Sequence, residues 1–511
     1  MSEAQKAQAS LSRRSFLKIA GLVGVAAHAG GLVASGIKVG EDHQTYTGWE
    51  SFNPGTQFFD RKPFEVAFPK HVPVGETARP SLMTDYVFGR VATFERAYNE
   101  NPDWTLDDPI EDLGVPQQLV DFYHEFPERL EWDYKTFSET IPLNREDRQI
   151  YGGYYRLAEA YESGFRAHAQ NLPRPQAPPE ISDWAAPGAD VSDPENFRRI
   201  GDPVPFKSPE LASDFIKEMA HRYGATLVGI TRTNLDYVYG DGWRGCPDDY
   251  DFSQLPETWE YSIVFGVPME WDVVFASPQF STSSDAYDRV STTAVRLEGC
   301  IKNLGYAART HSPNTGYDLL CPPHAVEAGL GEVARTGFCL TPELGLNFRA
   351  AVVTTNMPLA IDNPIEFGVA EFCKKCKLCA EGCPSGAISM ADSPDGMVIR
   401  GYEHWFINNG ACYNYWRETM GPMGCRLCVV TCPYSRKNNW VHDVARTLDP
   451  RDPTGLVNST LLWMQKSFFD APEALDYRRV EAGGEFASYR PEPSYLRAGD
   501  YLDIDITSPR S

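Results

Sequence analysis

The sequence is poor in basic residues, in cysteine and in long apolar runs, and each shortage excludes a class of protein. Lys and Arg number 47 against 70 Asp and Glu in 511 residues, so the formal net charge is -23. Sequence-independent nucleic-acid binding needs a basic surface, so we expect no nucleic-acid partner. Twelve cysteines are too few for a disulfide scaffold. The 42% hydrophobic content can fill a core, and the composition excludes collagen, coiled coil and wholesale disorder.

The apolar run near the N-terminus predicts an export signal. The segment 12–18 reads SRRSFLK, a weakly apolar Gly/Ala-rich stretch continues to Ile37, and Ala27-His28-Ala29 offers a cleavage site. A single membrane anchor is less favoured, because a span needs about 20 strongly apolar residues. The predicted twin-arginine signal, 1–37, carries folded and often cofactor-loaded proteins, so we expect a peripheral protein on the periplasmic face of the membrane. Since 1–37 holds four basic residues and one acidic residue, the remainder has a charge of -26.

Composition divides the rest of the chain into four regions. An aromatic-rich and irregular region, 38–205, ends in a proline-rich linker at 171–206. A layered α/β region is expected over 206–365, the cysteine-rich stretch over 366–440, and a C-terminal extension over 441–511.

The α/β region is predicted from capping and periodicity. Ser208 and Pro209 have the chemistry of a helix start, and Gly224 has that of a helix end. Leu211, Phe215 and Met219 recur every four residues between them. The other expected elements are strands at 225–230, 262–267 and 349–355 and a helix at 285–304 whose apolar face is Val290, Ala294, Leu297, Ile301 and Leu304.

Eight of the twelve cysteines lie in two motifs typical of iron–sulfur proteins. Residues 373–384 read C-x2-C-x2-C-x3-C-P, and 425–433 repeat its second half, with Cys412 twelve residues ahead. In two-cluster ferredoxins the fourth cysteine of each motif binds the other cluster. The spacing therefore predicts two 4Fe–4S clusters, close enough for electrons to hop between them. The first cysteine set is Cys373, Cys376, Cys379 and Cys432, and the second cysteine set is Cys412, Cys425, Cys428 and Cys383.

Other metal and cofactor patterns are weaker. A zinc ribbon uses two separated C-x2-C pairs, without a third x2 step or a following proline, and disulfides are disfavoured by the crowding. The four remaining cysteines are expected to be packing residues: Cys246, Cys300, Cys321 and Cys339. Residues 329–334 match G-x-G-x-x-A but follow a helical pattern, so no dinucleotide site is expected there. The ten histidines form no H-x3-H pair.

The leader, the α/β region and the two motifs together resemble the catalytic subunit of the respiratory reductive dehalogenases. The resemblance covers nearly the whole chain and is specific from about 260 to 445. The phrases that carry it are AGLGE at 328–332 with Arg335 and Gly337, TPE at 341–343, NFR at 347–349, MPL at 357–359, NNW at 438–440, and His442.

The resemblance implies a nitroreductase-like cobalamin-binding core followed by a bacterial ferredoxin-like domain with two 4Fe–4S clusters, an α/β (α+β) fold. It implies a corrinoid bound base-off, without a protein ligand below the cobalt, and the D-x-H-x-x-G signature of a lower histidine ligand is absent. In the family the clusters reduce cobalt to Co(I), which attacks an organohalide or transfers an electron to it. Halide leaves and carbon gains a proton. Corrinoid contacts are not assignable at this level.

The family's catalytic residues map onto three positions. Its proton donor, a Tyr at the start of the helix before an L-G-Y turn, corresponds to Tyr287, although the local A-Y-D-R differs from the Tyr-Ser of relatives. Its Arg in the N-x-R phrase corresponds to Arg349, and its polar partner to Asn314. A nearby guanidinium would stabilise the phenolate and ease proton release. A packing tyrosine, a strand-end salt bridge and a turn asparagine are the ordinary alternatives.

The resemblance also implies partners. Self-sufficient relatives append flavin and ferredoxin modules, whereas this sequence ends soon after the clusters, so we expect an external donor, a quinol system or a reduced redox protein. A small membrane protein is expected as anchor, and a homodimer is compatible with this organisation. The alternatives are an epoxyqueuosine reductase-like enzyme acting on tRNA, disfavoured by the leader and the acidic charge, and a non-catalytic iron–sulfur electron-transfer subunit, which would not need the α/β region.

Overall fold

The fold was analysed in a computed structural model, whose described residues all lie in one compact unit, 46–438 with 442–511. The described ranges are 61–69, 87–140, 153, 156–170, 172, 203–238, 259–277, 283–313, 317, 319–395, 403–416, 425–435, 448, 452, 454–468 and 492–504. The predicted leader and the greater part of the proline-rich linker lie outside them. Within these ranges no helix has the length and apolarity to cross a bilayer.

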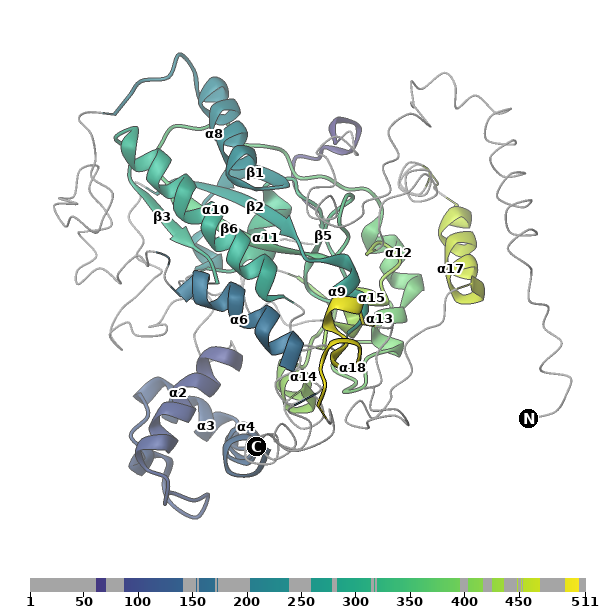
Figure 1. The fold of residues 1–511 in the computed structure, drawn as a ribbon. Helices are drawn as coiled ribbons and strands as arrows, with labels where there is room; N and C mark the ends of the chain where they lie inside the picture. The colour runs from purple at the N-terminus through teal and green to yellow at the C-terminus, as the bar shows by residue number, and fades with distance from the viewer. Residues whose placement is uncertain are drawn as a thin grey trace, which may run out of the picture. The chain divides into compact units, whose positions relative to one another are not determined.

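A four-stranded antiparallel sheet forms the centre of the described chain (Figure 1). Its order is β1 (Leu227–Arg232), β2 (Tyr261–Pro268), β6 (Phe348–Thr355) and β3 (Ala308–His311). The three predicted strands are confirmed, although β1 begins two residues later than expected. β3 was not predicted, because its sequence ARTH shows no apolar alternation.

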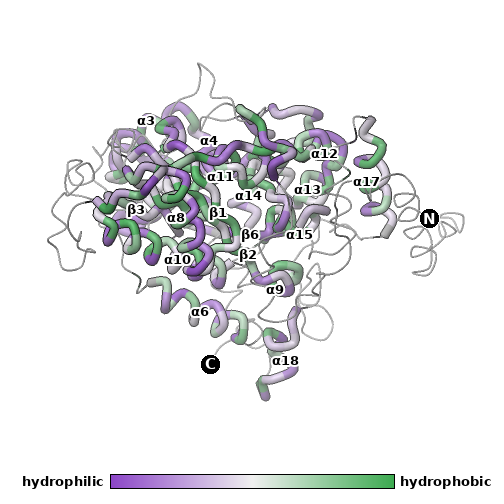
Figure 2. The backbone as a smooth tube through the Cα atoms, turned by 90° about the horizontal axis from the view of Figure 1, so that it is seen from above, coloured by the Kyte–Doolittle hydropathy of each residue, from purple (hydrophilic) through white to green (hydrophobic). Residues whose placement is uncertain are grey.

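Helices cover both faces of this sheet. α8 (Pro209–Tyr223) and α10 (Ser284–Asn303) share a hydrophobic core with one face of β2, and α11 (Cys321–Glu327) shares another core with the opposite face. Alternate residues of β2 divide accordingly, with Ile263 in the first core and Val264 in the second. Figure 2 shows alternating hydrophobic and hydrophilic stretches along α8 and α10, as expected of helices with one buried face.

The ends of α8 agree with the prediction, but its buried face does not. The Ser208 side chain accepts a hydrogen bond from the Leu211 amide at 3.3 Å, and Gly224 ends the helix with φ 122°. Leu211 is nevertheless 50% exposed, and Ala212, Ile216 and Ala220 are buried. The deepest face is thus one residue further along, because small residues let the helix approach the sheet closely. The predicted apolar face of α10 is buried from Val290 to Ile301, with Leu304 partly buried.

The expectation of an irregular chain is wrong for residues 87–140, which are mostly helical. α2 (Val87–Glu100), α3 (Gln117–Glu125) and α4 (Pro127–Lys135) enclose an aromatic core of their own. The frequent aromatic residues that masked a helical period are that core. The described residues of 38–205 also form η4 (Lys62–Phe64), η6 (Ile110–Leu113), η7 (Thr136–Thr140) and α6 (Arg156–Gln170).

The cysteine-rich stretch is a set of short helices. They are α12 (Val369–Cys376), α13 (Leu378–Glu381), α14 (Asn409–Tyr415) and α15 (Leu427–Val430). Nearby the chain forms η8 (Leu235–Tyr237), α9 (Trp271–Phe275) and a two-stranded ribbon of β4 (Glu332–Val333) and β5 (Cys339–Leu340). The C-terminal extension contributes α17 (Leu456–Phe468), which packs on α12, then η12 (Ser494–Leu496), which contacts α6, and α18 (Ala498–Tyr501).

Candidate functional site

The first cysteine set surrounds one cavity. Cys373, Cys376 and Cys379 line it from α12 and α13, and Cys432 lines it from just after α15. Three members therefore come from the first motif and the fourth from the second, which is the crossed grouping that the spacing predicts. Lys377 has φ 55° between α12 and α13, and this left-handed residue allows the chain to turn within the motif.

The second cysteine set is also brought together. Cys383, from the first motif, interacts electrostatically with Cys412, Cys425 and Cys428. Desolvation, with the charge of Cys383, raises the pKa of Cys412 to about 11. Desolvation and the neighbouring thiols raise the pKa of Cys425 to about 12, although the Leu427 amide and Arg426 oppose this shift. Cys379 of the first set interacts with Cys428 of the second, so the two sets are neighbours.

The chemistry of these thiols fits bound iron. Burial is the largest cause that raises the pKa of Cys373, Cys376 and Cys379, so ionising several of them together requires a cation. Metal coordination supplies it, since a coordinating thiol is deprotonated. Every cysteine of the described part is free of disulfides. In that part no three His, Cys, Asp or Glu side chains converge on a single metal ion, and the first set lies around a cavity instead.

Tyr287 lies in the first turn of α10, next to Arg349 at the start of β6. The Arg349 guanidinium carbon is 5.1 Å from the centroid of the Tyr287 ring. Burial by itself raises the pKa of this phenol, but the charges of Arg349 and Arg426, with hydrogen bonds from both, lower it below the ordinary tyrosine value. In the described part Arg349 donates to the Ser283 hydroxyl and to the Phe348 carbonyl and makes no ion pair with a carboxylate, so the strand-end salt bridge is not what holds it there. The structure therefore brings the predicted Tyr and Arg together.

Sequence reasoning missed Arg426, which belongs to the second cysteine motif. It stands between Cys425 and Cys428 with φ 54° and lies 5.7 Å from the ring of Trp416. Its Nε donates to the Ser283 hydroxyl at 3.0 Å, and Nη2 of Arg349 donates to the same hydroxyl at 3.0 Å. The only signal in the sequence was a basic residue between two cysteines. Contact with Tyr287 requires residues 139 positions apart to meet, which spacing does not reveal.

A partly buried ion pair lies in the first turns of α10. Nη2 of Arg289 donates to Asp285 at 2.8 Å, one turn away, and also to the carbonyl of Pro268 at the end of β2. Burial raises the pKa of Asp285, while Arg289 opposes that shift. Glu270, next along the chain after β2, accepts hydrogen bonds from Tyr161 of α6 and Tyr495 of η12. α6 and η12, which are far apart in the sequence, thus both contact Glu270.

Two buried polar atoms at the beginning of β6 have no hydrogen-bond partner within the described ranges. They are Nε of Arg349 and Oδ1 of Asn347. The Asn347 amide nitrogen is used, since it donates to the carbonyl of Met269 at 3.2 Å. A buried donor and a buried acceptor without partners are costly unless a ligand satisfies them. A polar cofactor or substrate with amide or hydroxyl groups fits this place. The predicted Asn314 lies outside the described residues, as do Cys246, 438–440 and His442.

The family comparison matches the cysteine region, and similarity to known proteins extends well beyond it. A 4Fe–4S dicluster domain model matches residues 372–436. The tetrachloroethene reductive dehalogenase of Sulfurospirillum multivorans is 34% identical over 293 residues, 51% of this chain and 55% of the relative. That of Dehalobacter restrictus is 30% identical over 313 residues, 52% and 55% respectively. The chain spans about half the length of these curated relatives. The resemblance to reductive dehalogenases is confirmed.

Solved structures agree in fold. A catabolic reductive dehalogenase superposes with a TM-score of 0.58 at 20% identity, over 84% of this chain and 53% of that chain. The same protein in complex with 3-bromo-4-hydroxybenzoic acid gives 0.55 at 19%, over 86% and 54%. The predicted fold class, a mixed helix and strand core with a dicluster domain, is therefore confirmed. The epoxyqueuosine reductase of Escherichia coli is 27% identical over 195 residues, 36% of this chain and 50% of that protein.

Proposed function

We propose that this protein is the catalytic subunit of a reductive dehalogenase, which replaces a halogen of an organohalide by hydrogen. The observation that carries the proposal is the contact of Tyr287 with two arginines, one of them set between two cysteines of the dicluster domain. This contact supports a proposed proton donor next to the proposed end of an electron route. Reductive dehalogenation consumes both electrons and a proton at carbon, whereas a pure electron carrier needs no such donor.

In this proposal Tyr287 supplies the proton, and the two arginines lower the pKa of its phenol. The phenol donates its proton to the carbon atom on which negative charge develops, and the guanidiniums of Arg349 and Arg426 stabilise the resulting phenolate. Ser283 accepts from both guanidiniums and so fixes their spacing. A bound corrinoid would supply reduced cobalt for cleavage of the carbon–halogen bond. The unsatisfied atoms of Arg349 and Asn347 would hold a polar group of that ligand.

The proposal includes two 4Fe–4S clusters and a corrinoid bound base-off. The two cysteine sets would hold the clusters, and the neighbouring Cys379 and Cys428 support short electron transfer between them. Metal analysis of the reconstituted protein tests this, with about eight iron atoms and one cobalt expected per chain. Eight irons without cobalt uptake would instead support the electron-transfer subunit.

Activity is tested by halide release. The reconstituted protein, reduced chemically, is incubated with chlorinated and brominated compounds. They include tetrachloroethene, for which one similar protein is named, and 3-bromo-4-hydroxybenzoic acid, which is bound in a similar structure. Protein reconstituted with iron but without corrinoid is the control. Corrinoid-dependent halide release supports the proposal, and corrinoid-loaded protein that releases none from any compound refutes it.

The proposal extends to export and to partners. The twin-arginine segment supports a periplasmic, membrane-associated protein that receives electrons from an external donor and docks on a small membrane protein. Replacing Arg13 and Arg14 by Lys is expected to retain the protein in the cytoplasm, as followed by cell fractionation. An unchanged periplasmic fraction would contradict the export route.

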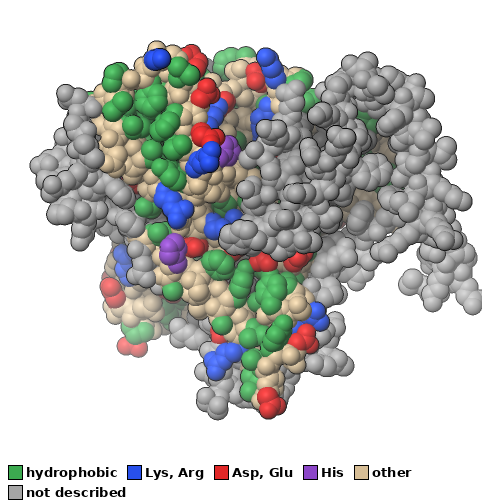
Figure 3. Space-filling model, turned by 45° about the horizontal axis from the view of Figure 1, so that its top comes forward, with side chains coloured by type: hydrophobic (Ala, Val, Ile, Leu, Met, Phe, Trp, Pro, Cys, Tyr) green, Lys and Arg blue, Asp and Glu red, His purple; other side chains and the backbone are tan. Residues whose placement is uncertain are grey.

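The epoxyqueuosine reductase alternative rests on the 27% identity reported above. A tRNA substrate needs a basic face, and Figure 3 shows acidic and basic side chains interspersed on the described part of one face. A binding assay with a tRNA stem-loop at two salt concentrations separates the two functions, because tight, salt-sensitive binding is expected only of the alternative.

A further inference from the structure

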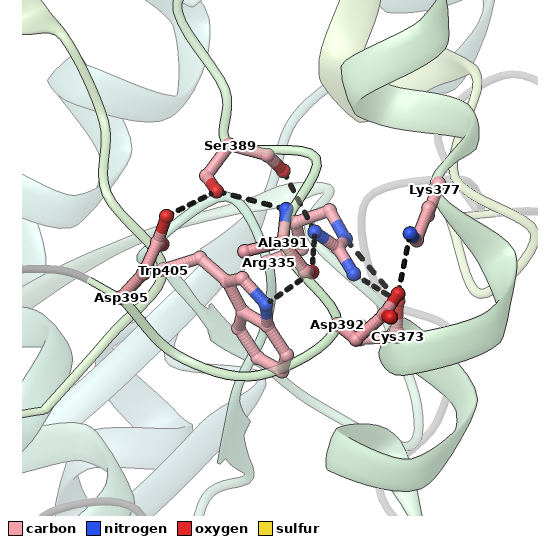
Figure 4. Close-up of polar contacts among 8 residues, drawn as sticks. All are labelled: Arg335, Cys373, Lys377, Ser389, Ala391, Asp392, Asp395 and Trp405. Atoms are coloured by element: carbon pink, nitrogen blue, oxygen red, sulfur yellow. Dashed lines mark hydrogen bonds and ion pairs between the residues drawn. The ribbon is translucent and has the colours of Figure 1, made fainter.

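Arg335 is a buried cation outside the Tyr287 site. It follows β4, it is 1% exposed, and it lines the cavity of the first cysteine set. Figure 4 shows its guanidinium enclosed by the chain around Ser389, Ala391 and Cys373, with Trp405 alongside. The proposed mechanism does not use this residue.

The guanidinium is fixed by backbone carbonyls. Nε and Nη2 donate to the carbonyl of Cys373 at 3.2 and 2.8 Å, and Nη1 donates to those of Ser389 and Ala391 at 2.7 and 2.8 Å. The Trp405 ring lies 4.9 Å from its central carbon. These bonds use four of the five N–H donors of an arginine. The chain therefore holds the group in one orientation beside a cysteine of the first set.

In the described part of the chain no carboxylate forms an ion pair with this guanidinium, although its charge helps to lower the pKa of Asp392 and Asp395 nearby. Asp392 is paired with Lys377 at 2.6 Å, and its side chain is 90% exposed. Asp395 accepts from the Ser389 hydroxyl at 2.7 Å and from the Phe406 amide at 2.9 Å. Both aspartates are engaged elsewhere and near solvent, where charge interactions are screened. Carbonyls solvate a cation without balancing it, so the buried charge is left only partly balanced, which is costly. An anion in the adjoining cavity would balance it.

A second polar group faces the same cavity. Thr336, next to Arg335, lines it, and its buried hydroxyl has no hydrogen-bond partner among the described residues. A hydroxyl left without a partner in a cavity lined by four cysteines fits a group there that accepts hydrogen bonds. An iron–sulfur cluster held by four thiolates is such a group, since it is negatively charged, and reduction adds one more negative charge.

We propose that Arg335 is the counter-charge of the cluster held by the first cysteine set, and that it raises the reduction potential of this cluster. The inference rests on the proposed clusters, but not on dehalogenase activity. Cluster potentials depend on net charge, hydrogen bonds and solvent exposure. A fixed, buried positive charge favours the reduced state, which carries the larger negative charge. Arg335 is thus a positioning residue that makes this cluster readily accept electrons.

The test is a redox titration of the iron-loaded full chain, followed by electron paramagnetic resonance. The cluster concerned is identified by the signal that Cys373→Ser removes. In Arg335→Met its reduced-to-oxidised ratio at a fixed potential is expected to fall about tenfold or more, where tenfold corresponds to 59 mV for one electron. In Arg335→Lys, which keeps the charge, the ratio is expected to change less than about threefold. The potential of the other cluster should shift less than that of this one in Arg335→Met.

Lys374→Gln is the matched control. Lys374 follows Cys373 directly, but it is partly exposed and paired with Glu371 at 2.7 Å, so its removal should leave the potential nearly unchanged. Equal shifts in Arg335→Met and Arg335→Lys would overturn the proposal, because the carbonyl hydrogen bonds rather than the charge would then set the potential. Should Arg335→Met fail to keep iron, Arg335→Lys decides, since a large shift there refutes the role of charge. A wild-type chain that binds no iron would refute the clusters, a different failure.

Discussion

Replacing Tyr287 by Phe removes one hydroxyl and leaves the ring that packs against Arg349. The guanidinium carbon 5.1 Å from the ring centroid keeps its cation–π contact, and both arginines keep the Ser283 hydroxyl as an acceptor. The variant should therefore fold, with a loss of about 1–3 kcal/mol from the hydrogen bonds to the phenolic oxygen.

The expected effect on turnover is much larger. A positioned general acid contributes about 10²–10⁴-fold, so Tyr287→Phe should lower kcat by that factor. At 1.36 kcal/mol per tenfold, the loss is about 2.7–5.4 kcal/mol of transition-state stabilisation. Stability and catalysis are thus separated, because only catalysis requires the proton of this hydroxyl.

The assay is halide release per corrinoid by chemically reduced protein, with the folded fraction measured by thermal unfolding. Tyr306→Phe is the matched control, because it also removes a phenolic hydroxyl. This hydroxyl donates to the Val204 carbonyl at 2.8 Å and takes no part in the Tyr287 site. Tyr306→Phe should keep its activity. Full activity in Tyr287→Phe would refute the assignment of the proton donor, and equal losses in both variants would show a general effect of hydroxyl removal.

Three further outcomes are expected. Activity should fall as pH rises through the pKa of Tyr287, which Arg349 and Arg426 lower. Arg349→Gln should therefore move this alkaline limb of the pH–activity profile to higher pH, whereas Arg349→Lys should leave it in place. An unmoved limb in Arg349→Gln would contradict the coupling of the two residues. Cys432→Ala should remove the same paramagnetic signal as Cys373→Ala, because both line one cavity; different signals lost would contradict the crossed grouping. Burial lowers the pKa of His324 to about 4, so as pH falls from about 6.5 to 4 the imidazole is protonated in the unfolded chain but not in the folded one. Up to about 3 kcal/mol of unfolding free energy should be lost in that window. In chemical denaturation, His324→Gln should reduce this dependence of the unfolding free energy on pH, and an unchanged dependence would contradict the shift.

Local chemistry explains which elements were predictable. The helix from Pro209 has a serine cap, a proline in its first turn and a closing glycine, and β2 is a continuous apolar run, so both were found from neighbouring residues alone. The helices of 87–140 were missed because aromatic residues occur on their buried and partly exposed sides alike. β3 was missed because pairing with β6 stabilises it, a partner more than 35 residues away.

The sequence by itself predicted the cluster ligands. Cysteine spacing is a local property of a turn, so the crossed sets and the dicluster domain follow from eight positions, and the resemblance placed Tyr287 and Arg349. Only the tertiary structure showed which charged side chains lie next to these residues. Arg426 reaches Tyr287, and Arg335 adjoins the first cysteine set, because the sheet and the dicluster domain pack together. The strength of an electrostatic interaction depends on the distance between the groups in space and on their burial, and the spacing of residues along the chain determines neither.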